Sequence, residues 1–202
     1  SSSEKNGTIE VVASVNQWGT VAKTLGGDNV NVTSIINSTN VDAHDYEPTT
    51  SDIAKLQKAQ VIIVNGAGYD AWAVKAAQSA NATIVNAAAV GGVNDGENPH
   101  VWFSADVRKA VAQAITEAYE QADAAKRSDF DKLHDQWKSE ENNVESKIAE
   151  VKQKSDGLAY AATESVASYL AEDMGLTDAT PSGYARATAN ESEPTPTDIK
   201  QF

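Results

Sequence analysis

The sequence predicts an α/β protein with parallel sheets, arranged as two lobes that one long helix joins. Three observations support this fold class. Short β-branched runs alternate with helical patterns over residues 9–90, and this rhythm is typical of βαβ units. A helical pattern then continues without a break from about 127 to 154. A further strand-like run and a second copy of an early segment follow that helix.

The first lobe is predicted to contain four strands with helices between them. Val61–Val64 (VIIV) is the most strand-like run of the chain, because a continuous apolar run is typical of a strand buried on both faces. The other strands are expected at 9–15, 30–36 and 82–85, and the helices at 16–25, 49–59 and 69–79. A further helix is expected after Ser104, whose hydroxyl suits an N-cap.

The long helix carries one narrow apolar stripe. Its members recur at spacings of three, four and seven: Phe130, Leu133, Trp137, Val144, Ile148 and Val151. A helix over 127–154 would be about 42 Å long, enough to cross a whole domain. We therefore expect a stiff strut between lobes, with a flexible tether at 1–8, a first lobe at 9–123, a linking helix at 124–156 and a partial second lobe at 157–202.

The second lobe is expected to hold a strand at 158–163, a helix at 164–174 and a weak strand at 184–189. Its last segment, SEPTPTDIKQF (192–202), matches YEPTTSDIAKL (46–56) at Glu-Pro-Thr and at Asp-Ile. Both copies encode a capping box, with Thr49 and Asp52 in the first. Two independent capping boxes would explain the match, but we favour duplicated lobes. A duplicated second lobe would stop early, so the chain is expected to be truncated.

Composition excludes several classes of protein. The chain has 29 acidic and 16 basic residues and a net charge of −13, which argues against nucleic-acid binding. It has no cysteine, so thiolate metal sites, disulfides and thiol catalysis are excluded together. No apolar run approaches the roughly 20 residues that a membrane helix needs.

Two of the three histidines are candidate metal ligands. His44 (in DAHDYEPTTSD) and His100 lie on loops that precede helices, at the edge where the carboxyl ends of parallel strands meet. Both could instead be satisfied loop residues. Glu164 adds a carboxylate at a helix start, where an ordinary first-turn acid is the alternative. His134 is expected on the surface of the long helix, without a role.

Three stretches resemble one known family. DAHDYEPTTSD, NPHVWFSADVRK and TESVASYLAEDMGL are similar to segments of the solute-binding proteins of zinc and manganese ABC transporters, also called adhesion lipoproteins. The resemblance implies two Rossmann-like α/β lobes with a metal in the cleft between them. His44, His100 and Glu164 match the first three ligand segments, and the fourth, acidic ligand would lie beyond residue 202.

The resemblance also implies a function. The protein would capture a divalent metal ion outside the cytoplasm, either as a cell-surface lipoprotein or in the periplasm, and deliver it to an ABC permease. It would be a monomer and no enzyme. Two histidines with carboxylates favour Mn²⁺, with Zn²⁺ or Fe²⁺ possible. A metal-dependent hydrolase and a surface adhesin with incidental metal are the alternatives, although no nucleophile elbow, G-x-x-x-x-G-K loop or H-E-x-x-H motif occurs.

Overall fold

The computed structural model describes residues 7–38, 40–154, 158–161, 168–189 and 193–202. The first lobe is built on a parallel sheet of β1 (Ile9–Val15), β2 (Val30–Ile36), β3 (Val61–Val64) and β4 (Thr83–Asn86), in the order β2-β1-β3-β4. All four predicted strands are present. The chain moves from β1 outward to β2 and then crosses to β3, so the direction of winding reverses between β1 and β3. Open parallel sheets bind ligands beside such a switch point, outside the carboxyl ends of the strands.

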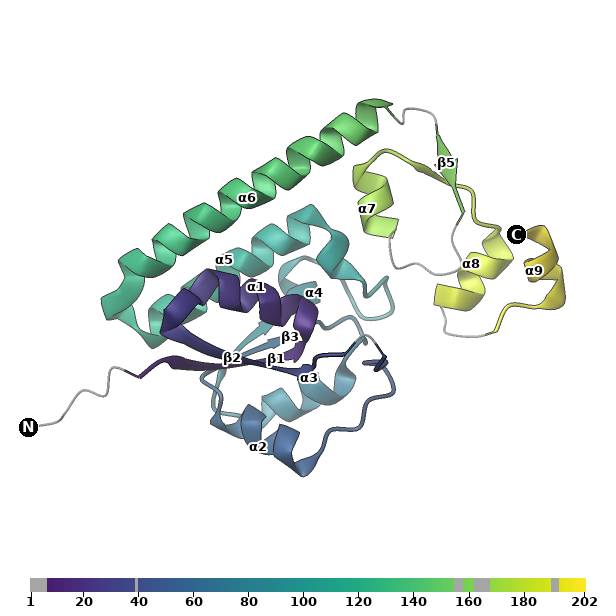
Figure 1. Cartoon of the computed structure of the whole chain (residues 1–202). Helices are drawn as coiled ribbons and strands as arrows, with labels where there is room; N and C mark the ends of the chain where they lie inside the picture. Colours follow the sequence, from purple (N-terminus) through teal and green to yellow (C-terminus); the bar gives the residue numbers. More distant parts are fainter. Residues whose placement is uncertain (1–6, 39, 155–157, 162–167, 190–192) are drawn as a thin grey trace, which may run out of the picture.

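Helices cover both faces of this sheet, and the alternation of side chains along each strand separates two cores (Figure 1). One face packs against α1 (Asn16–Gly26) and α5 (Ala105–Ala122). The other packs against α2 (Thr50–Lys58) and α3 (Ala71–Gln78). The remaining short helices of this lobe are α4 (Ala87–Val90) and the 3₁₀ turns η1 (Gly27–Asn29), η2 (Val101–Phe103) and η3 (Ala124–Lys126).

The predicted N-caps are confirmed. Thr49 accepts a hydrogen bond from the Asp52 main-chain nitrogen at 3.1 Å, and Asp52 accepts one from the Thr49 nitrogen at 2.9 Å. The Tyr46 hydroxyl donates a hydrogen bond of 2.6 Å to the same Asp52 oxygen, which fixes the loop ahead of α2. Ser104 caps α5.

Helix α6 (Arg127–Lys154) has the predicted bounds and runs beside the first lobe towards the second (Figure 1). Its first half packs on α1 and α5 with Phe130 and Trp137 buried, whereas Val144 and Val151 in its second half are exposed. His134 is only 6% exposed, so the expectation of a surface position for it was wrong. It lies four residues after Phe130 and three before Trp137, on the face that packs on α5.

The described part of the second lobe has a two-stranded parallel sheet of β5 (Ala159–Tyr160) and β6 (Thr177–Asp178), with α7 (Ser168–Asp173), α8 (Ser182–Ala189) and α9 (Pro196–Gln201). The sequence did not predict β6, and the strand expected at 184–189 is a helix. There the Thr188 hydroxyl donates to the Tyr184 and Ala185 carbonyls, as threonine does inside helices, and the alanines favour helix.

The second copy of the capping segment forms the predicted structure. Thr195 and Asp198 make a capping box, and Pro196 takes the first position of α9. The copies differ in what precedes them: the first follows the strand β2, whereas the element described before the second is the helix α8, where a strand was expected. Among the described residues, no helix combines the length and the apolarity needed to cross a bilayer.

Candidate metal centre

The loops that carry His44 and His100 are built alike. In each, a side-chain oxygen two residues earlier accepts a hydrogen bond from the histidine main-chain nitrogen. Asp42 Oδ1 accepts from His44 at 2.9 Å, and Asn98 Oδ1 accepts from His100 at 3.1 Å. These are Asx turns, in which a short polar side chain closes the loop in place of a main-chain carbonyl. The sequence patterns D-A-H and N-P-H therefore produce the same local bend.

One segment of the first lobe supports both turns. The residue between the Asx and the histidine presents its carbonyl to a side chain from the β3–α3 connection or from α3. Trp72 Nε1 donates to the Ala43 carbonyl at 3.0 Å, and Asn65 Nδ2 donates to the Pro99 carbonyl at 2.8 Å. Because Asn65 follows β3 directly and Trp72 lies in the first turn of α3, both histidine loops are fixed to one rigid unit.

Asn65 is itself held by a buried network. Its Oδ1 accepts from Trp18 Nε1 at 2.9 Å, and its main-chain nitrogen donates to the Asp70 carboxylate at 2.8 Å. The same carboxylate accepts from the Gly66 nitrogen at 2.9 Å and from the Ser14 hydroxyl. Burial raises the pKa of Asp70, and the hydrogen bonds from Ser14, Asn65 and Gly66 oppose that rise. Side chains from β1 and α1 and the connection after β3 thus form one hydrogen-bond network around Asn65, which holds the Pro99 carbonyl.

The tautomer of the His100 ring follows from its contacts. Asn98 Oδ1 lies 2.8 Å from His100 Nδ1 as well as 3.1 Å from the His100 main-chain nitrogen. A main-chain N–H can only donate, so the Asn98 atom that meets it is the carboxamide oxygen. In a neutral ring, Nδ1 then carries the proton and Nε2 the lone pair. This is the state in which imidazole binds a metal through Nε2 while its other nitrogen donates to a supporting oxygen.

Aromatic rings enclose the His100 side. The ring centroids of Tyr69 and Trp102 lie 6.0 Å and 5.5 Å from that of His100, both in edge-to-face geometry. Burial raises the pKa of Tyr69, and the Asp42 and Asp70 carboxylates raise it further, so its hydroxyl stays protonated at neutral pH. The half-buried imidazole therefore has apolar walls beside it.

A cavity of about 600 Å³ lies beside these loops. It opens at the carboxyl ends of β1 and β2, and its lining includes Val15, Ile36, Ala43, Tyr69 and Trp102. Ala43 precedes His44, and the rings of Tyr69 and Trp102 pack beside His100. Residues next to both histidines therefore line the same cavity. The sequence predicted that the two loops would meet at this edge of the sheet, and the structure places their neighbours there.

Glu164 lies within residues 162–167, outside the part of the chain that the structure describes. Among the described residues, no group of three or more His, Asp and Glu side chains is arranged to hold a metal ion. The first lobe therefore contributes two histidine loops to the candidate centre, and Glu164 stays a prediction.

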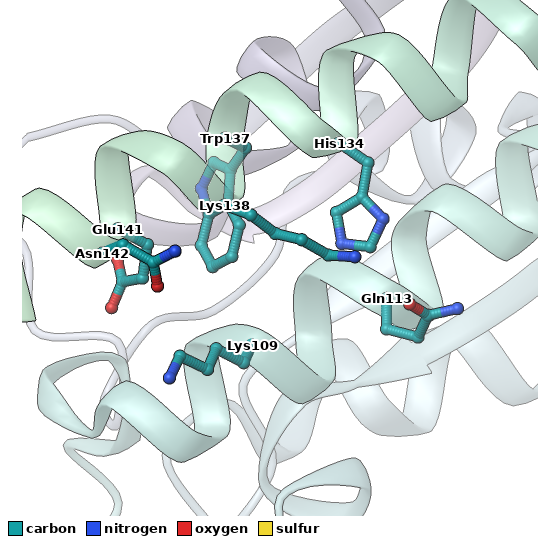
Figure 2. A pocket seen from close by; sticks show the side chains of 7 residues that line it. All are labelled: Lys109, Gln113, His134, Trp137, Lys138, Glu141 and Asn142. Carbon is teal, nitrogen blue, oxygen red and sulfur yellow. The ribbon is translucent and has the colours of Figure 1, made fainter.

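A smaller cavity, of about 290 Å³, separates α5 from α6 (Figure 2). It is lined by Lys109, Gln113, His134, Trp137, Lys138, Glu141 and Asn142. Burial, and then the nearby Lys138 ammonium, lower the pKa of His134, which favours a neutral ring. His134 thus belongs to the packing between α5 and α6.

Sequence reasoning missed the residues that position the two histidines. Asp42 and Asn98 had a readable signal, since an Asx residue two positions before each histidine indicates an Asx turn. Asn65, Asp70 and Trp72 had none, because each has a partner on another element or loop, 29 to 56 positions away in the sequence. Only the fold brings them to the loops.

Comparison with known proteins places the chain. Residues 11–202 match the model of the family described as zinc-uptake complex component A, periplasmic. The chain belongs to this family. It is 27% identical over 228 residues to the manganese ABC transporter substrate-binding lipoprotein PsaA of Streptococcus pneumoniae, covering 99% of this chain and 69% of that protein. It is 25% identical over 170 residues to the iron-binding protein YfeA of Yersinia pestis, covering 77% of this chain and 53% of that protein.

Solved structures show the same fold. The metal-dependent lipoprotein YcdH of Bacillus subtilis aligns with a TM-score of 0.77 at 24% identity, covering 85% of this chain and 66% of that one. A crystal structure of ZnuA aligns with a TM-score of 0.80 at 20% identity, covering 96% and 76%. The chain therefore spans between about half and three quarters of the length of these proteins. The predicted class, two α/β lobes with parallel sheets joined by a long helix, is confirmed.

Proposed function

We propose that this chain is part of a solute-binding protein that captures a divalent transition metal between two lobes and delivers it to an ABC permease in the membrane. The observation that carries the proposal is the pair of matching Asx turns at His44 and His100, on two loops that side chains of one segment, Asn65 and Trp72, support. Family membership supports it, because the family description names an uptake complex and no enzyme.

The proposed ligands are His44, His100 and Glu164, with the ion held where a first lobe (9–123) faces a second lobe (157–202) across the linking helix (124–156). The short contact between His100 Nδ1 and the Asn98 side-chain oxygen supports this assignment, because metal-binding histidines commonly donate their other ring nitrogen to such an oxygen. Glu164 is proposed from its place in the third family-like segment. Residues 1–8 would act as a tether.

The metal is proposed to be Mn²⁺ rather than Zn²⁺ or Fe²⁺, as cargo and not as a resident cofactor. A carboxylate beside two imidazoles shifts preference towards harder ions, although Zn²⁺ stands above Mn²⁺ in intrinsic affinity. The relatives named above are described as manganese and iron binders, and the family as a zinc-uptake component. The names periplasmic and lipoprotein support an extracytoplasmic site of action, and we propose a tethered monomer. None of these names refers to hydrolysis or to adhesion.

Metal analysis tests the proposal. The purified chain is loaded with Mn²⁺ or Zn²⁺, separated from excess ion and analysed for metal content, alongside His44→Ala, His100→Ala and Glu164→Ala. Each substitution is expected to weaken binding by at least about tenfold, since each removes one ligand. His134→Gln is the matched control, because His134 packs between α5 and α6; it should bind as the unchanged chain does. If none of the three substitutions lowers bound metal, the proposed site is wrong.

A further inference from the structure

A hydrogen bond crosses from the second lobe to the His100 loop. The hydroxyl of Tyr169, on α7, donates to the main-chain carbonyl of Asn98 at 2.8 Å, across 71 positions of sequence. The Tyr169 ring also packs against the main core of the first lobe. α7 follows the segment that contains Glu164, so this contact lies close in sequence to the third proposed ligand.

Asn98 is the junction of this contact. Its carbonyl accepts from Tyr169, while its side-chain oxygen accepts from both the main-chain nitrogen and Nδ1 of His100. The next residue, Pro99, has a fixed φ, and its own carbonyl is held by Asn65. These contacts restrain both the main chain and the side chain of Asn98. A displacement of its carbonyl should therefore also displace its carboxamide, which contacts His100.

We propose that Tyr169 and Asn98 are positioning residues for His100: Asn98 selects the ring tautomer, and Tyr169 couples the placement of the second lobe to the orientation of that ring. This inference rests on the proposed function, because the orientation of the His100 ring affects metal release only if His100 binds the ion. When the lobes are in the described arrangement, the Tyr169 bond secures the turn that holds His100. When the second lobe tilts away, the bond breaks and the turn that holds His100 loosens. The tilt would then weaken the hold of His100 on the ion at the same time as it withdraws the ligand of the second lobe.

The chemistry of Tyr169 suits this role. Burial raises its pKa, and the Glu97 and Glu172 carboxylates raise it further, so the hydroxyl remains a protonated donor at neutral pH. The acceptor is a carbonyl that precedes proline, in a turn that the first lobe fixes from its other side. A tyrosine that served only to fill space would not need its hydroxyl, and this distinguishes the proposal from simple packing.

Tyr169→Phe tests the coupling, because it keeps the ring and removes only the donor. Zn²⁺ is the probe, and its transfer to an excess of chelator gives the dissociation rate. We expect release to become about threefold to tenfold faster, the effect of one lost neutral hydrogen bond. In the metal-free chain, the amide of His100 should exchange its hydrogen faster by a similar factor. Tyr184→Phe is the matched control, because Tyr184 lies on α8 against Phe202; it should change neither quantity.

Asn98 supplies a second, spectroscopic test. In the unchanged metal-free chain at pH 8, the ¹⁵N shifts of His100 should show the proton on Nδ1. Asn98→Asp keeps an oxygen acceptor and should preserve this signature, whereas Asn98→Ala should populate the other tautomer. Unchanged zinc release and amide exchange in Tyr169→Phe would overturn the coupling, and an unchanged tautomer in Asn98→Ala would overturn the selection.

The two levels of the proposal fail differently. If the unchanged chain binds neither Mn²⁺ nor Zn²⁺, the proposed function fails, and amide exchange and tautomer still decide whether Tyr169 and Asn98 position His100. If the chain binds metal but Tyr169→Phe behaves like Tyr184→Phe, the coupling fails and the proposed function stands.

Discussion

At the scale of single residues, the candidate centre depends on a carboxylate that touches neither histidine. Asp70 is fully buried and accepts hydrogen bonds from Ser14, Asn65 and Gly66, and through Asn65 it determines where the Pro99 carbonyl is held. Each of those donors would be left buried and unpaired without it. Such a group costs about 1 to 3 kcal/mol when its partner is removed.

Asp70→Ala should therefore lower the free energy of unfolding by roughly 3 kcal/mol or more, measured by urea denaturation. It should also weaken metal binding, because the support of the His100 loop is lost. Asp106→Ala is the control: Asp106 is exposed in the first turn of α5, and its loss should cost about 0.5 kcal/mol. A similar, small loss for both variants would show that the Asp70 network is not a determinant of stability.

At the scale of elements, the two capping boxes offer a matched pair. In α2, burial acts to raise the pKa of Asp52, but hydrogen bonds from Tyr46 and from the Thr49 nitrogen and hydroxyl outweigh it and hold the pKa below 3.8. A carboxylate whose folded pKa is lowered stabilises the fold above its unfolded pKa, and this stability is lost as the pH falls through the folded value. α9 has the same box at Thr195 and Asp198, but none of its residues is buried.

Asp52→Asn should accordingly be less stable than the unchanged chain by about 1 kcal/mol at pH 6, with the difference shrinking as the pH falls below 3.8. Urea denaturation over a pH series measures it. Asp198→Asn is the companion variant and should have a smaller effect at every pH, because its box is at the surface. If the stability difference between Asp52→Asn and the unchanged chain stays the same in acid, the ionised Asp52 carboxylate is not the group that stabilises α2.

Local signals explain which elements could be predicted. The strand at Val61–Val64, the caps at Thr49 and Ser104, and the bounds of α6 follow from patterns within a few residues. The helix at Ser182–Ala189 was taken for a strand because YARATA is short and has no strong period. The burial of His134 was missed because a polar residue on a polar helix gives no sign of what packs over it. For the candidate centre, the histidines were readable, and the side chains that hold them were not.

At the scale of the whole molecule, α6 limits how the lobes can move. Its 28 residues form an unbroken helix whose first half is packed on α1 and α5, so its direction is fixed by the first lobe. Sharp bends in helices occur mostly at proline, at glycine or serine pairs and at bulges, and the sequence of α6 contains neither proline nor glycine. We therefore expect the second lobe to tilt modestly relative to the first rather than to swing widely.

Solution scattering with and without metal should consequently give similar radii of gyration. The expected change is a small fraction of what a hinged clamshell would show, and His44→Ala mixed with metal should reproduce the metal-free profile. A contraction of several ångströms on metal addition would mean that α6 bends or detaches, and would overturn the strut as a restraint.

The shared support of the two histidine loops has a kinetic consequence. Asn65 and Trp72 belong to one stretch of chain, so the carbonyls ahead of His44 and His100 are both held by the first lobe. If the ion is held as proposed, the first lobe offers a ready landing place and governs how fast an ion arrives. The second lobe, through its own ligand and through Tyr169, governs how long the ion stays. Substitutions in the first lobe should then change mainly the rate of metal binding, and substitutions in the second lobe mainly the rate of metal release.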